Sequence, residues 1–426
     1  MLDINRIREN PEAVKNALLK RMDSVDFTNL LKEDAECRKL LQEVEGLKAR
    51  RNKVSADIPR LKKEGKDISS LMDEMKEVGE SIKSLDARCA TLQDSIRTFM
   101  ESLPNVPADD VLPGNKENNK VVKTFGEKPT FSFKAKDHIE IAQSLKLIDY
   151  ERGVKLGGNG FWIYQGEGAR LEWALLQYFI DQHIKDGYTF MLLPHILNWQ
   201  SGITAGQFPK FVDDVFTLTG AEDKEHTQFL LPTAETALIN LYRDEIIPEA
   251  ELPKKLFGYT PCYRKEAGSY RAAERGMIRG HQFNKVEMFA YCLPEDSDKI
   301  LDELIAKASA LVEGLGLHYR VSKLAAGDCS ASMAKTFDVE VWIPSMNEYK
   351  EVSSASNAHD YQARRGNIRY KQQASGKNLF VHTLNASGLA TSRLFPAILE
   401  QFQQEDGSVV VPEVLRKWVG RDQLTL

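Results

Sequence analysis

Two runs of apolar residues at heptad spacing constrain the fold of the first part of the chain more than any other feature. The first run extends from Cys37 to Leu61, and the second from Leu71 to Leu103. Steps of three and four residues place such side chains along one stripe of an α-helix, as in a coiled-coil seam. A polar break around Gly65 separates the runs. We therefore expect an antiparallel helical hairpin whose second helix is about 50 Å long.

Local signals accompany the two expected helices. Ser70 and Asp73 have the spacing of a capping box at the start of the second helix. Pro59 is expected to kink or weaken the first helix near its end. Basic residues gather toward the turn, where they form either a solvated surface or a grip on a phosphate backbone. They are Lys48, Arg50, Arg51, Lys53, Arg60, Lys62, Lys63 and Lys66.

The rest of the chain has the pattern of a mixed α/β domain. We expect one short helix in residues 1–25 and a polar linker, punctuated by Pro and Gly, over about 108–130. Strands separated by long insertions predict an α+β fold, with an antiparallel sheet flanked by helices. The division predicted is an N-terminal helical-hairpin domain, 1–107, and a second domain, 108–426. Further helices are expected at 172–184, 233–246, 300–315 and 389–405, and strands at 188–193 and 337–343.

Composition narrows the class of protein. A chain of 426 residues with 42% hydrophobic residues is expected to form about two globular domains. No apolar run has the length of a membrane span, and the polar first residues predict no secretory signal. A net charge of −5 means that any nucleic-acid contact must come from a local patch. The five dispersed cysteines contain no CxxC pair, which argues against a disulfide framework or a zinc site and favours a reducing cytoplasm.

The stretch from Pro261 to Tyr291 carries the densest chemistry. It predicts two paired strands, the first presenting Arg264 and Glu266 on one face. Alternation along the return strand places Phe283, Lys285, Glu287 and Phe289 on one face as well. The connection between them contains Arg271, Arg275 and Arg279, and arginine binds phosphate through its planar fork. The stretch favours a nucleotide-binding hairpin, with a charged surface hairpin as the alternative.

Three further fragments carry oxygen ligands or an arginine. Thr233 and Glu235 place a hydroxyl and a carboxylate at a helix start. Glu351 and Ser354 are a reasonable pair of oxygen ligands for Mg²⁺. The stretch from Asn385 to Arg393 runs through small residues into a helix, where a backbone approaches a ligand and an arginine reaches phosphate. Each fragment alone also fits an ordinary cap or ion pair. The sequence has no GxxxxGK[ST] loop, no HExxH and no GxSxG elbow.

Taken together, these segments resemble a bacterial-type seryl-tRNA synthetase, a class II aminoacyl-tRNA synthetase, over essentially the whole chain. The family's three motifs are matched by Gly187-Tyr188 with Pro194, by Tyr263–Glu266 with His281–Phe283, and by Asn385–Arg393. The N-terminal helical hairpin matches too. Further matching segments are Gln207–Phe211, Thr233–Glu235, Gln362–Arg365, Gln404–Gly407 and Pro412–Arg416.

The resemblance implies ATP-dependent ligation of L-serine to tRNA(Ser) through a seryl-adenylate. It implies ATP and Mg²⁺ as the small-molecule partners, no zinc, a homodimer built on the first motif, and a cytoplasmic enzyme without a membrane anchor. It leaves open whether tRNA(Sec) is also charged with serine.

The resemblance also implies site residues. Arg264, Glu266 and Arg393 would have catalytic roles. The ATP-binding set would be Arg264, Lys265, Glu266, Arg279, Phe283, Glu351, Val352, Ser353, Ser354 and Arg393, with Glu351 and Ser354 also holding Mg²⁺. The serine-binding set would be Thr233, Ala234, Glu235, Arg264, Glu287, Asn385 and Ser387. The arm residues that meet tRNA would be Lys48, Arg50, Arg51, Lys53, Arg60, Lys62 and Lys63.

Some positions depart from the commonest family pattern. Ala355 stands where a Cys is frequent, Ala386 where a Gly is frequent, and Ser392 where a Gly usually precedes the arginine. The loop Tyr270–Glu274 lacks the usual Gly-Arg-Asp-Thr run. Two alternatives remain at this stage: a paralogue that activates an amino acid and loads it onto a carrier protein, and a non-catalytic tRNA-binding homologue.

Overall fold

The computed structural model describes every residue except 219, 221–222, 224–225 and 267–275, and the chain divides into two units. One unit comprises residues 2–16 and 23–103. The other comprises residue 1, residues 17–22 and residues 104–426. The first unit is helical and the second is built around a sheet, so the two are described in turn.

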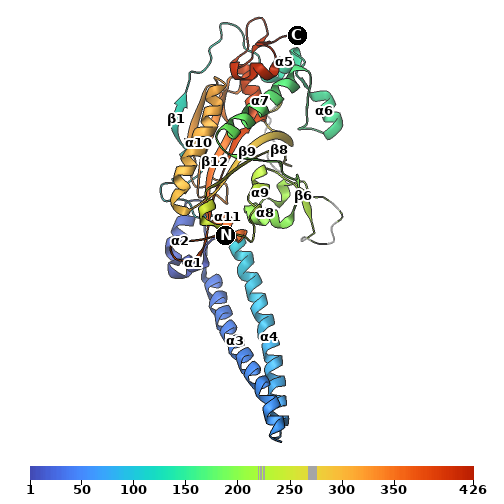
Figure 1. Cartoon of the computed structure of the whole chain (residues 1–426). Helices are drawn as coiled ribbons and strands as arrows, with labels where there is room; N and C mark the ends of the chain where they lie inside the picture. The colour runs from blue at the N-terminus through green and yellow to red at the C-terminus, as the bar shows by residue number, and fades with distance from the viewer. Residues whose placement is uncertain (219, 221–222, 224–225, 267–275) are drawn as a thin grey trace. The chain divides into compact units, whose positions relative to one another are not determined.

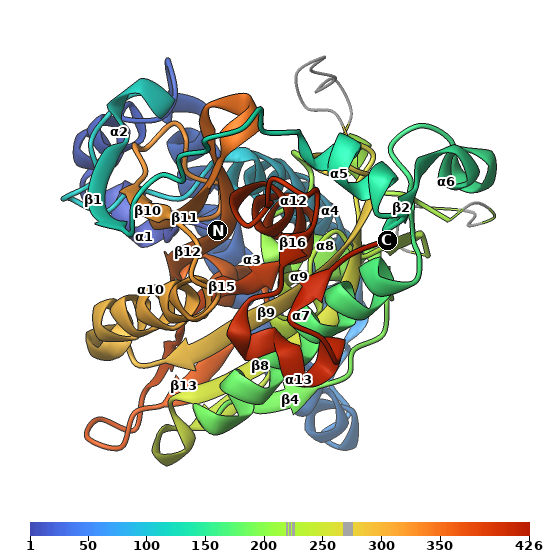
Figure 2. The ribbon, with the colours of Figure 1, turned by 90° about the horizontal axis from the view of Figure 1, so that it is seen from above.

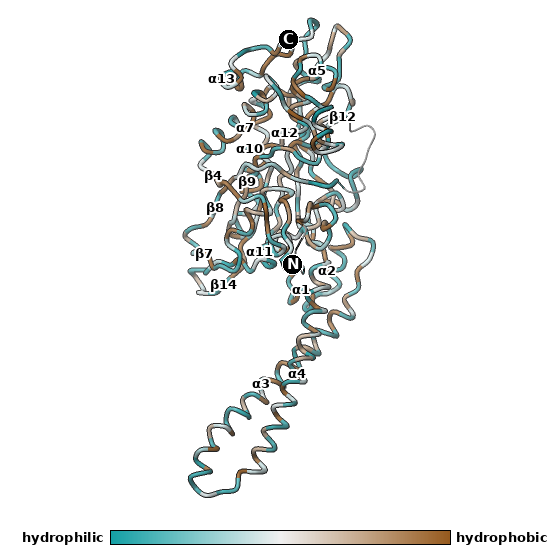
Figure 3. Tube along the Cα trace, turned by 90° about the vertical axis from the view of Figure 1, so that its right-hand side faces the viewer, coloured by the Kyte–Doolittle hydropathy of each residue, from teal (hydrophilic) through white to brown (hydrophobic). Residues whose placement is uncertain are grey.

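The first unit contains the predicted helical hairpin. Its long helices are α3 (Thr28–Lys63) and α4 (Ser69–Ser102), which lie side by side (Figure 1). Val44, Val78 and Ile82 form a buried cluster between them. Figure 3 shows hydrophobic residues recurring at intervals along both helices, as heptad spacing requires. The prediction of a hairpin is therefore confirmed.

The ends of these helices differ from the sequence expectation. Residues 1–25 form two short helices, α1 (Ile4–Glu9) and α2 (Pro11–Leu18), where one was expected. The expected capping box at Ser70 is wrong, because α4 begins at Ser69, its N-cap residue is Ile68, and no side chain caps it from that position. The Asp67 carboxylate accepts hydrogen bonds from the Ser69 backbone nitrogen and hydroxyl, at 2.9 and 2.7 Å. Pro59 lies inside α3, which continues to its end at Lys63.

The second unit is organised on a sheet of eight strands within the described residues. The order is β1-β10-β11-β12-β15-β9-β8-β4. All neighbours are antiparallel except β4 and β8, which are parallel, so the predicted antiparallel sheet is confirmed. The strands are β1 (Lys120–Phe125), β4 (Thr189–Met191), β8 (Lys254–Tyr263), β9 (Gln282–Cys292), β10 (Tyr319–Lys323), β11 (Lys335–Ile343), β12 (Glu348–His359) and β15 (His382–Ala390).

Helices cover both faces of this sheet (Figures 1 and 2). Strand β9 shows the division, because Val286 and Met288 belong to one core cluster and Phe289 and Tyr291 to another. The first cluster includes side chains of α7 (Glu167–Lys185), α10 (Ser297–Gly314) and α12 (Thr391–Gln401). The second includes side chains of α8 (Trp199–Ala205), α9 (Ala234–Leu238) and α11 (Tyr361–Arg365).

The remaining elements are short and lie around this framework. Small sheets are formed by β7 (Ile246–Pro248) with β13 (Arg369–Lys371) and β14 (Asn378–Phe380), by β2 (Ile148–Asp149) with β3 (Ile163–Tyr164), by β5 (Ile196–Asn198) with β6 (Gln228–Leu230), and by β16 (Val409–Val410) with β17 (Gln423–Leu424). The short α-helices are α5 (His138–Ser144), α6 (Tyr150–Gly157) and α13 (Arg416–Val419). No helix among the described residues is long and apolar enough to cross a membrane.

Several predicted elements of the second unit differ from the structure. The helix expected over 233–246 is the short α9, which ends at Leu238, and Ile246 begins strand β7. The helix expected from Leu389 begins only at Thr391, because β15 continues to Ala390. Strand β1 lies inside the expected linker. All six of its residues are exposed, so it lacks the apolar alternation by which a strand is recognised.

The hairpin seam gives a stability prediction. Leu92 is 4% exposed in α4, whereas Leu41 is 38% exposed in α3. We expect Leu92→Ala to lower the local stability of the hairpin by about 2–4 kcal/mol, because it leaves a cavity in the seam. Hydrogen exchange of the α3 and α4 amides measures this local stability. Leu41→Ala is the matched control, and an equal loss of protection in both variants would contradict the packing described.

Candidate functional site

The predicted hairpin is formed by β8 and β9, which pair from Lys254↔Tyr291 to Tyr263↔Gln282. One detail of the prediction is wrong, since β8 ends at Tyr263 and both Arg264 and Glu266 lie beyond it. Glu266 has a φ of 51°, so strand alternation does not set its direction. The predicted residues Arg271 and Arg275, and the loop Tyr270–Glu274, lie outside the described residues.

Arg264 is held where the hairpin leaves the sheet. Its Nε donates to the Pro232 carbonyl at 3.1 Å, and its guanidinium carbon lies 5.2 Å from the centre of the Phe283 ring. The backbone also fixes this residue, because its amide donates to the His281 carbonyl at 2.9 Å. Arg279 forms an ion pair with Glu266 beside it. The Arg264 guanidinium and the Phe283 ring thus lie together at the end of the hairpin, and a cation beside an aromatic ring suits a nucleotide.

A hydrogen-bonded cluster of polar side chains, called the pocket from here on, lies next to this group on the same face of β9. Its deepest carboxylate belongs to Glu287, whose residue is 0% exposed. The Asn385 side-chain nitrogen donates to Glu287 Oε1 at 3.0 Å, and the Ser387 hydroxyl donates to Oε2 at 3.3 Å. Both partners come from β15, which pairs with β9 and places Ser387 directly opposite Glu287. Three of the residues predicted to bind serine therefore lie in hydrogen-bond contact with one another.

A second carboxylate, that of Glu235, enters the pocket from the first turn of α9. Gln362 donates to its Oε1 at 2.7 Å, and Asn385 donates to its Oε2 at 3.3 Å. Glu235 keeps part of its surface exposed, yet protein surrounds the carboxyl group. Burial, followed by the negative charge of Glu287, raises the pKa of Glu235 to about 7, although the Gln362 hydrogen bond and nearby cations oppose the shift.

Lys285 is the residue that sequence reasoning left out of the site. The alternation along β9 placed it on the same face as Glu287, but the serine-binding set omitted it. Its ammonium group pairs with the Glu287 carboxylate and donates to the Thr233 hydroxyl at 2.7 Å. Lys285 is 6% exposed, so this is a buried ion pair. One ammonium group pairs with Glu287, whereas Glu235 makes no ion pair within the described residues and feels the Arg264 charge only from a distance. With both carboxylates ionised, this hydrogen-bonded set therefore has one negative charge without an ion-pair partner.

Asn385 presents an acceptor without a partner. Its side-chain nitrogen donates to both Glu235 and Glu287, which fixes the orientation of the amide. Its oxygen Oδ1 is buried and has no hydrogen-bond partner within the described part of the chain. A buried acceptor of this kind is costly unless a ligand supplies a donor. The pocket therefore suits a small ligand that carries both a cation and a hydroxyl group.

The third part of the candidate site lies where α12 begins. Arg393, in the first turn of α12, donates through Nη1 to the Glu351 carbonyl at 2.9 Å and lies 3.5 Å from the Glu351 carboxylate. Ser354 lies opposite Asp338 in the pairing of β12 with β11. Burial, with the charge of Glu351 adding to it, raises the pKa of Asp338 well above its usual range.

These oxygens fit a hard cation. Magnesium in nucleotide sites is held by one or two carboxylates together with substrate phosphates, and here Glu351 and Ser354 supply a carboxylate and a hydroxyl. The Glu351 charge disfavours ionisation of the Asp338 carboxyl group, and a cation bound between the two carboxyl groups would relieve this repulsion. Within the described residues no group of three or more His, Cys, Asp or Glu side chains forms a metal cage, so such a cation would depend on the phosphates.

Four other predicted site residues have side chains that turn away from the pocket or into solvent. Ala234 and Val352 belong to core clusters, so only their backbones are available to a ligand. The Ser353 hydroxyl donates to the Ser387 carbonyl at 2.6 Å and so braces β15. Lys265 is exposed.

The predicted arm residues all lie in the helical-hairpin unit and divide into two groups. Lys48 pairs with Asp86, Arg50 with Glu74, and Arg60 with Asp57. Among the described residues, no ion pair is made by the second group, which is exposed and consists of Arg51, Lys53, Lys62 and Lys63.

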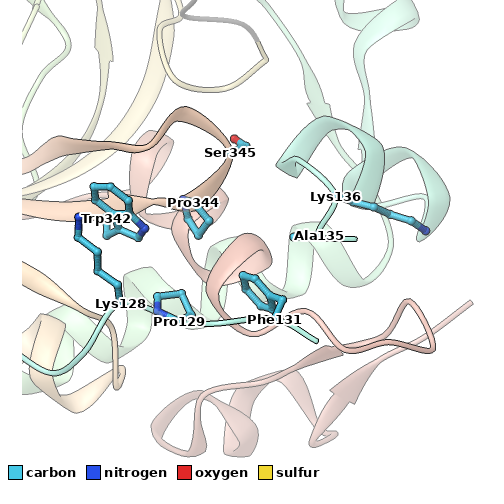
Figure 4. A pocket seen from close by; sticks show the side chains of 8 residues that line it. All are labelled: Lys128, Pro129, Phe131, Ala135, Lys136, Trp342, Pro344 and Ser345. Atoms are coloured by element: carbon cyan, nitrogen blue, oxygen red, sulfur yellow. The ribbon is translucent and has the colours of Figure 1, made fainter. Parts of the chain in front are cut away.

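A separate cavity of about 350 Å³ lies away from these residues (Figure 4). It is lined by the 128–136 segment and by the end of β11, with the Lys128 ammonium 3.4 Å from the centre of a Trp342 ring. None of the predicted site residues lines it. The candidate site is therefore the region formed by β8, β9, β12, β15 and the starts of α9 and α12.

Comparison with known proteins agrees with this arrangement. Residues 1–107 match the family model described as the seryl-tRNA synthetase N-terminal domain, and residues 216–402 match the tRNA synthetase class II core domain (G, H, P, S and T). The chain is 64% identical to serine–tRNA ligase 2 of Clostridium acetobutylicum over 425 residues, covering 100% of both chains.

The chain is also similar to solved structures in its three-dimensional fold. The crystal structure of seryl-tRNA synthetase from Pyrococcus horikoshii complexed with ATP has a TM-score of 0.91 and 34% identity, covering 100% of this chain and 99% of that one. The cytoplasmic serine–tRNA ligase of Naegleria fowleri in complex with AMP has a TM-score of 0.86 and 29% identity, covering 100% and 99%.

The buried ion pair in the pocket gives a second prediction. We expect Lys285→Met to destabilise the second unit by about 3 kcal/mol, because it leaves the Glu287 carboxylate buried without its cation. Chemical denaturation followed by tryptophan fluorescence measures the change. Lys265→Met is the matched control, since Lys265 is exposed, and it should leave the stability within about 0.5 kcal/mol of the wild type. Equal stability of the two variants would refute the assigned pair.

Proposed function

The chain belongs to the class II seryl-tRNA synthetases, and we propose that its reaction, the ATP-dependent ligation of serine to tRNA, runs in the site formed around Glu235 and Glu287. The observation that carries the proposal is the pairing of a small anionic pocket with an arginine-rich, aromatic surface on one face of β9. The anionic pocket suits the ammonium group of an amino acid, and the arginine-rich, aromatic surface suits a nucleotide. Full-length similarity to serine–tRNA ligases supports this assignment over a carrier-loading paralogue or a non-catalytic homologue.

In the proposed pocket, serine places its ammonium group beside Glu235 and the unpartnered oxygen of Asn385. Its hydroxyl group points deeper, toward Glu287 and Ser387. Thr233 accepts hydrogen bonds from Lys285 and from the Glu235 amide, so its own hydroxyl proton is available to a ligand. Alanine would leave the buried polar groups without the hydroxyl, and threonine would add a methyl group to a small site.

ATP is proposed to lie along the hairpin, with adenine stacked on Phe283 and the α-phosphate beside Arg264. Arg279 and Arg393 take the outer phosphates, and Glu266 completes the hairpin side of the site. Lys265 and the backbone of Val352 and Ser353 border the nucleotide. When bound, Mg²⁺ held by Glu351, Ser354 and the phosphates would neutralise charge on the phosphate chain.

The proposed chemistry is positioning and charge neutralisation. The serine carboxylate attacks the α-phosphorus of ATP and pyrophosphate leaves, which gives seryl-adenylate. The 3′-terminal ribose hydroxyl of tRNA then attacks the seryl carbonyl and AMP leaves. Arg264 stabilises the negative charge that develops at the α-phosphate, and no covalent enzyme intermediate is needed.

A homodimer is proposed on the side of the sheet where β4 is the edge strand. Strand β4 pairs only with β8 in the described sheet. Large apolar side chains are exposed on and around it, with Trp173 and Ile184 of α7 each 53% exposed and Leu192 80% exposed. An edge strand and apolar side chains of this kind favour contact with a second copy of the chain.

The proposal also includes a role for the helical arm and a cellular compartment. Residues 1–107 form the domain that grips tRNA(Ser) through its basic residues, and residues 108–426 form the catalytic domain. tRNA(Sec) is the second tRNA to be tested as a substrate. The place of action is the cytoplasm, which suits five cysteines that are buried and unpaired.

Amino-acid-dependent ATP–pyrophosphate exchange tests the proposed function. Serine, alanine, threonine and glycine should be compared with the same enzyme preparation. We expect serine to be preferred by a factor of about 100 or more over alanine, because buried partners lose their hydroxyl group. Preference for any other amino acid would overturn the assignment of the pocket.

Arg264 provides a test of the ATP assignment. We predict that Arg264→Ala slows adenylate formation about 100-fold or more, a cost of roughly 3 kcal/mol in the transition state. Exchange kinetics at saturating serine measure the effect, and Lys371→Ala is the control, because Lys371 is exposed and belongs to none of the proposed binding sets. A folded Arg264→Ala protein with near-normal exchange would remove Arg264 from the mechanism.

The two groups of basic arm residues provide a test of tRNA binding. We predict that replacing Arg51, Lys53, Lys62 and Lys63 with Ala weakens tRNA(Ser) binding and flattens its salt dependence, because fewer counterions are released. Serine activation should not change. Replacing Lys48, Arg50 and Arg60, which already pair with carboxylates, should have a smaller effect for each residue changed. Deletion of residues 34–98 with unchanged tRNA affinity would show that the arm does not bind tRNA.

A further inference from the structure

Glu172 is a buried carboxylate that the proposed reaction does not use. It lies in α7 and is 3% exposed. Its hydrogen-bond partner on β9 is Asn284, whose neighbours along the strand are Phe283 and Lys285. Because side chains alternate along a strand, Asn284 points to the opposite face from these two site residues. Glu172 therefore contacts the site's central strand from behind.

Glu172 also contacts the start of α12. Its Oε1 accepts a hydrogen bond from the Thr391 hydroxyl at 2.6 Å and one from the Asn284 side chain at 2.7 Å. The Thr391 hydroxyl lies 3.2 Å from the Asn284 carbonyl as well. One carboxylate oxygen thus joins helix α7, strand β9 and the first residue of α12.

The side chains joined in this way lead directly to proposed ATP-binding residues. Arg393 is two residues beyond Thr391 in the same helical turn, and Phe283 precedes Asn284. The Tyr259 hydroxyl donates to the Asn284 oxygen at 3.1 Å, so both ends of the Asn284 amide are held. Loss of Glu172 would leave the half-buried Asn284 side-chain nitrogen without its carboxylate acceptor and would remove the strongest hydrogen bond of the Thr391 hydroxyl at the start of α12.

We infer that Glu172 is a positioning residue that holds the first turn of α12, and with it Arg393, against β9 on the ATP side of the candidate site. The inference rests on the proposed function, because it takes Arg393 and Phe283 as ATP-binding residues. Glu172 touches neither substrate, and its effect passes through Thr391 and Asn284. Its effect is expected on ATP more than on serine, because Thr391 begins the helical turn that carries Arg393, whereas Glu172 makes no hydrogen bond with Glu235, Glu287 or their partners among the described residues.

The surroundings of Glu172 favour an uncharged side chain that still accepts hydrogen bonds. Its second oxygen, Oε2, is buried without a hydrogen-bond partner in the described residues. Burial raises the pKa of Glu172 to about 7, against the opposing interactions with the Thr391 hydroxyl, the Asn284 amide and the Tyr164 hydroxyl. A glutamine side chain would keep one oxygen for both donors and would remove the charge. Glutamine is therefore the conservative replacement and alanine the disruptive one.

The test separates the KM for ATP from the KM for serine in pyrophosphate exchange. We expect Glu172→Ala to raise the KM for ATP about tenfold and to change the KM for serine less than about twofold. Glu172→Gln should restore the KM for ATP to within about threefold of the wild type. Thr391→Val, which removes only a hydroxyl group, should raise the KM for ATP in the same direction.

Glu400 provides the matched control for a merely structural effect. It is 0% exposed, lies at the other end of α12, and accepts hydrogen bonds from His138 and Ser345. Glu400→Ala should lower thermal stability without a selective rise in the KM for ATP. If Glu172→Ala is too unstable to assay, the Glu172→Gln and Thr391→Val pair carries the comparison.

Three results would overturn the inference: an unchanged KM for ATP in folded Glu172→Ala or Thr391→Val, an equal rise in both KM values, or a Glu172→Gln enzyme as impaired as Glu172→Ala. Failure of the proposed function looks different. In that case the wild-type enzyme would show no serine-dependent exchange, or Arg393→Ala would leave the KM for ATP unchanged.

Discussion

The ion pair between Lys285 and Glu287 is the interaction on which the candidate site depends. Two carboxylates, from α9 and β9, converge on one small pocket, and a buried ammonium group is what allows them to do so. Because Lys285 also binds Thr233, it connects the start of α9 to β9. The pocket is then left one cation short, and serine can supply that cation as its ammonium group.

Strand β9 contributes side chains both to the hydrophobic core and to the candidate site. Its alternate side chains pack under α7, α10 and α12, while Phe283, Lys285 and Glu287 lie on the other face. On the first face Asn284 meets Glu172, so the position of the hairpin formed by β8 and β9 is tied to helix α7. Trp173, the next residue along α7, is exposed and lies 5.9 Å from Tyr259, ring centre to ring centre. A partner seated on α7 would therefore lie close to these hydrogen bonds.

Sequence periodicity predicted the helices and strands that have a regular apolar pattern. It could not predict contacts between side chains that lie far apart in the sequence. Heptads predicted the hairpin of α3 and α4, and alternation placed Lys285 beside Glu287. Neither pattern could show that Thr233, 52 residues away, binds Lys285, and the exposed strand β1 has no apolar pattern at all. The structure also explains why Ala355 and Ala386 can depart from the commonest family pattern together. These two buried residues are direct cross-strand partners, so a Cys-to-Ala and a Gly-to-Ala change offset each other in volume.

The central claim, that serine supplies the missing cation of the pocket, is tested most directly by counting protons. In the free enzyme the raised pKa of Glu235, about 7, means that this carboxyl group is partly protonated at neutral pH. An ammonium group favours the ionised form, so serine binding should release a proton. Calorimetric titration with serine in two buffers of different ionisation enthalpy should show release of about half a proton at pH 7, rising toward one at pH 6 and falling to about a tenth at pH 8. Serine binding without proton release at pH 6 and 7 would contradict the account.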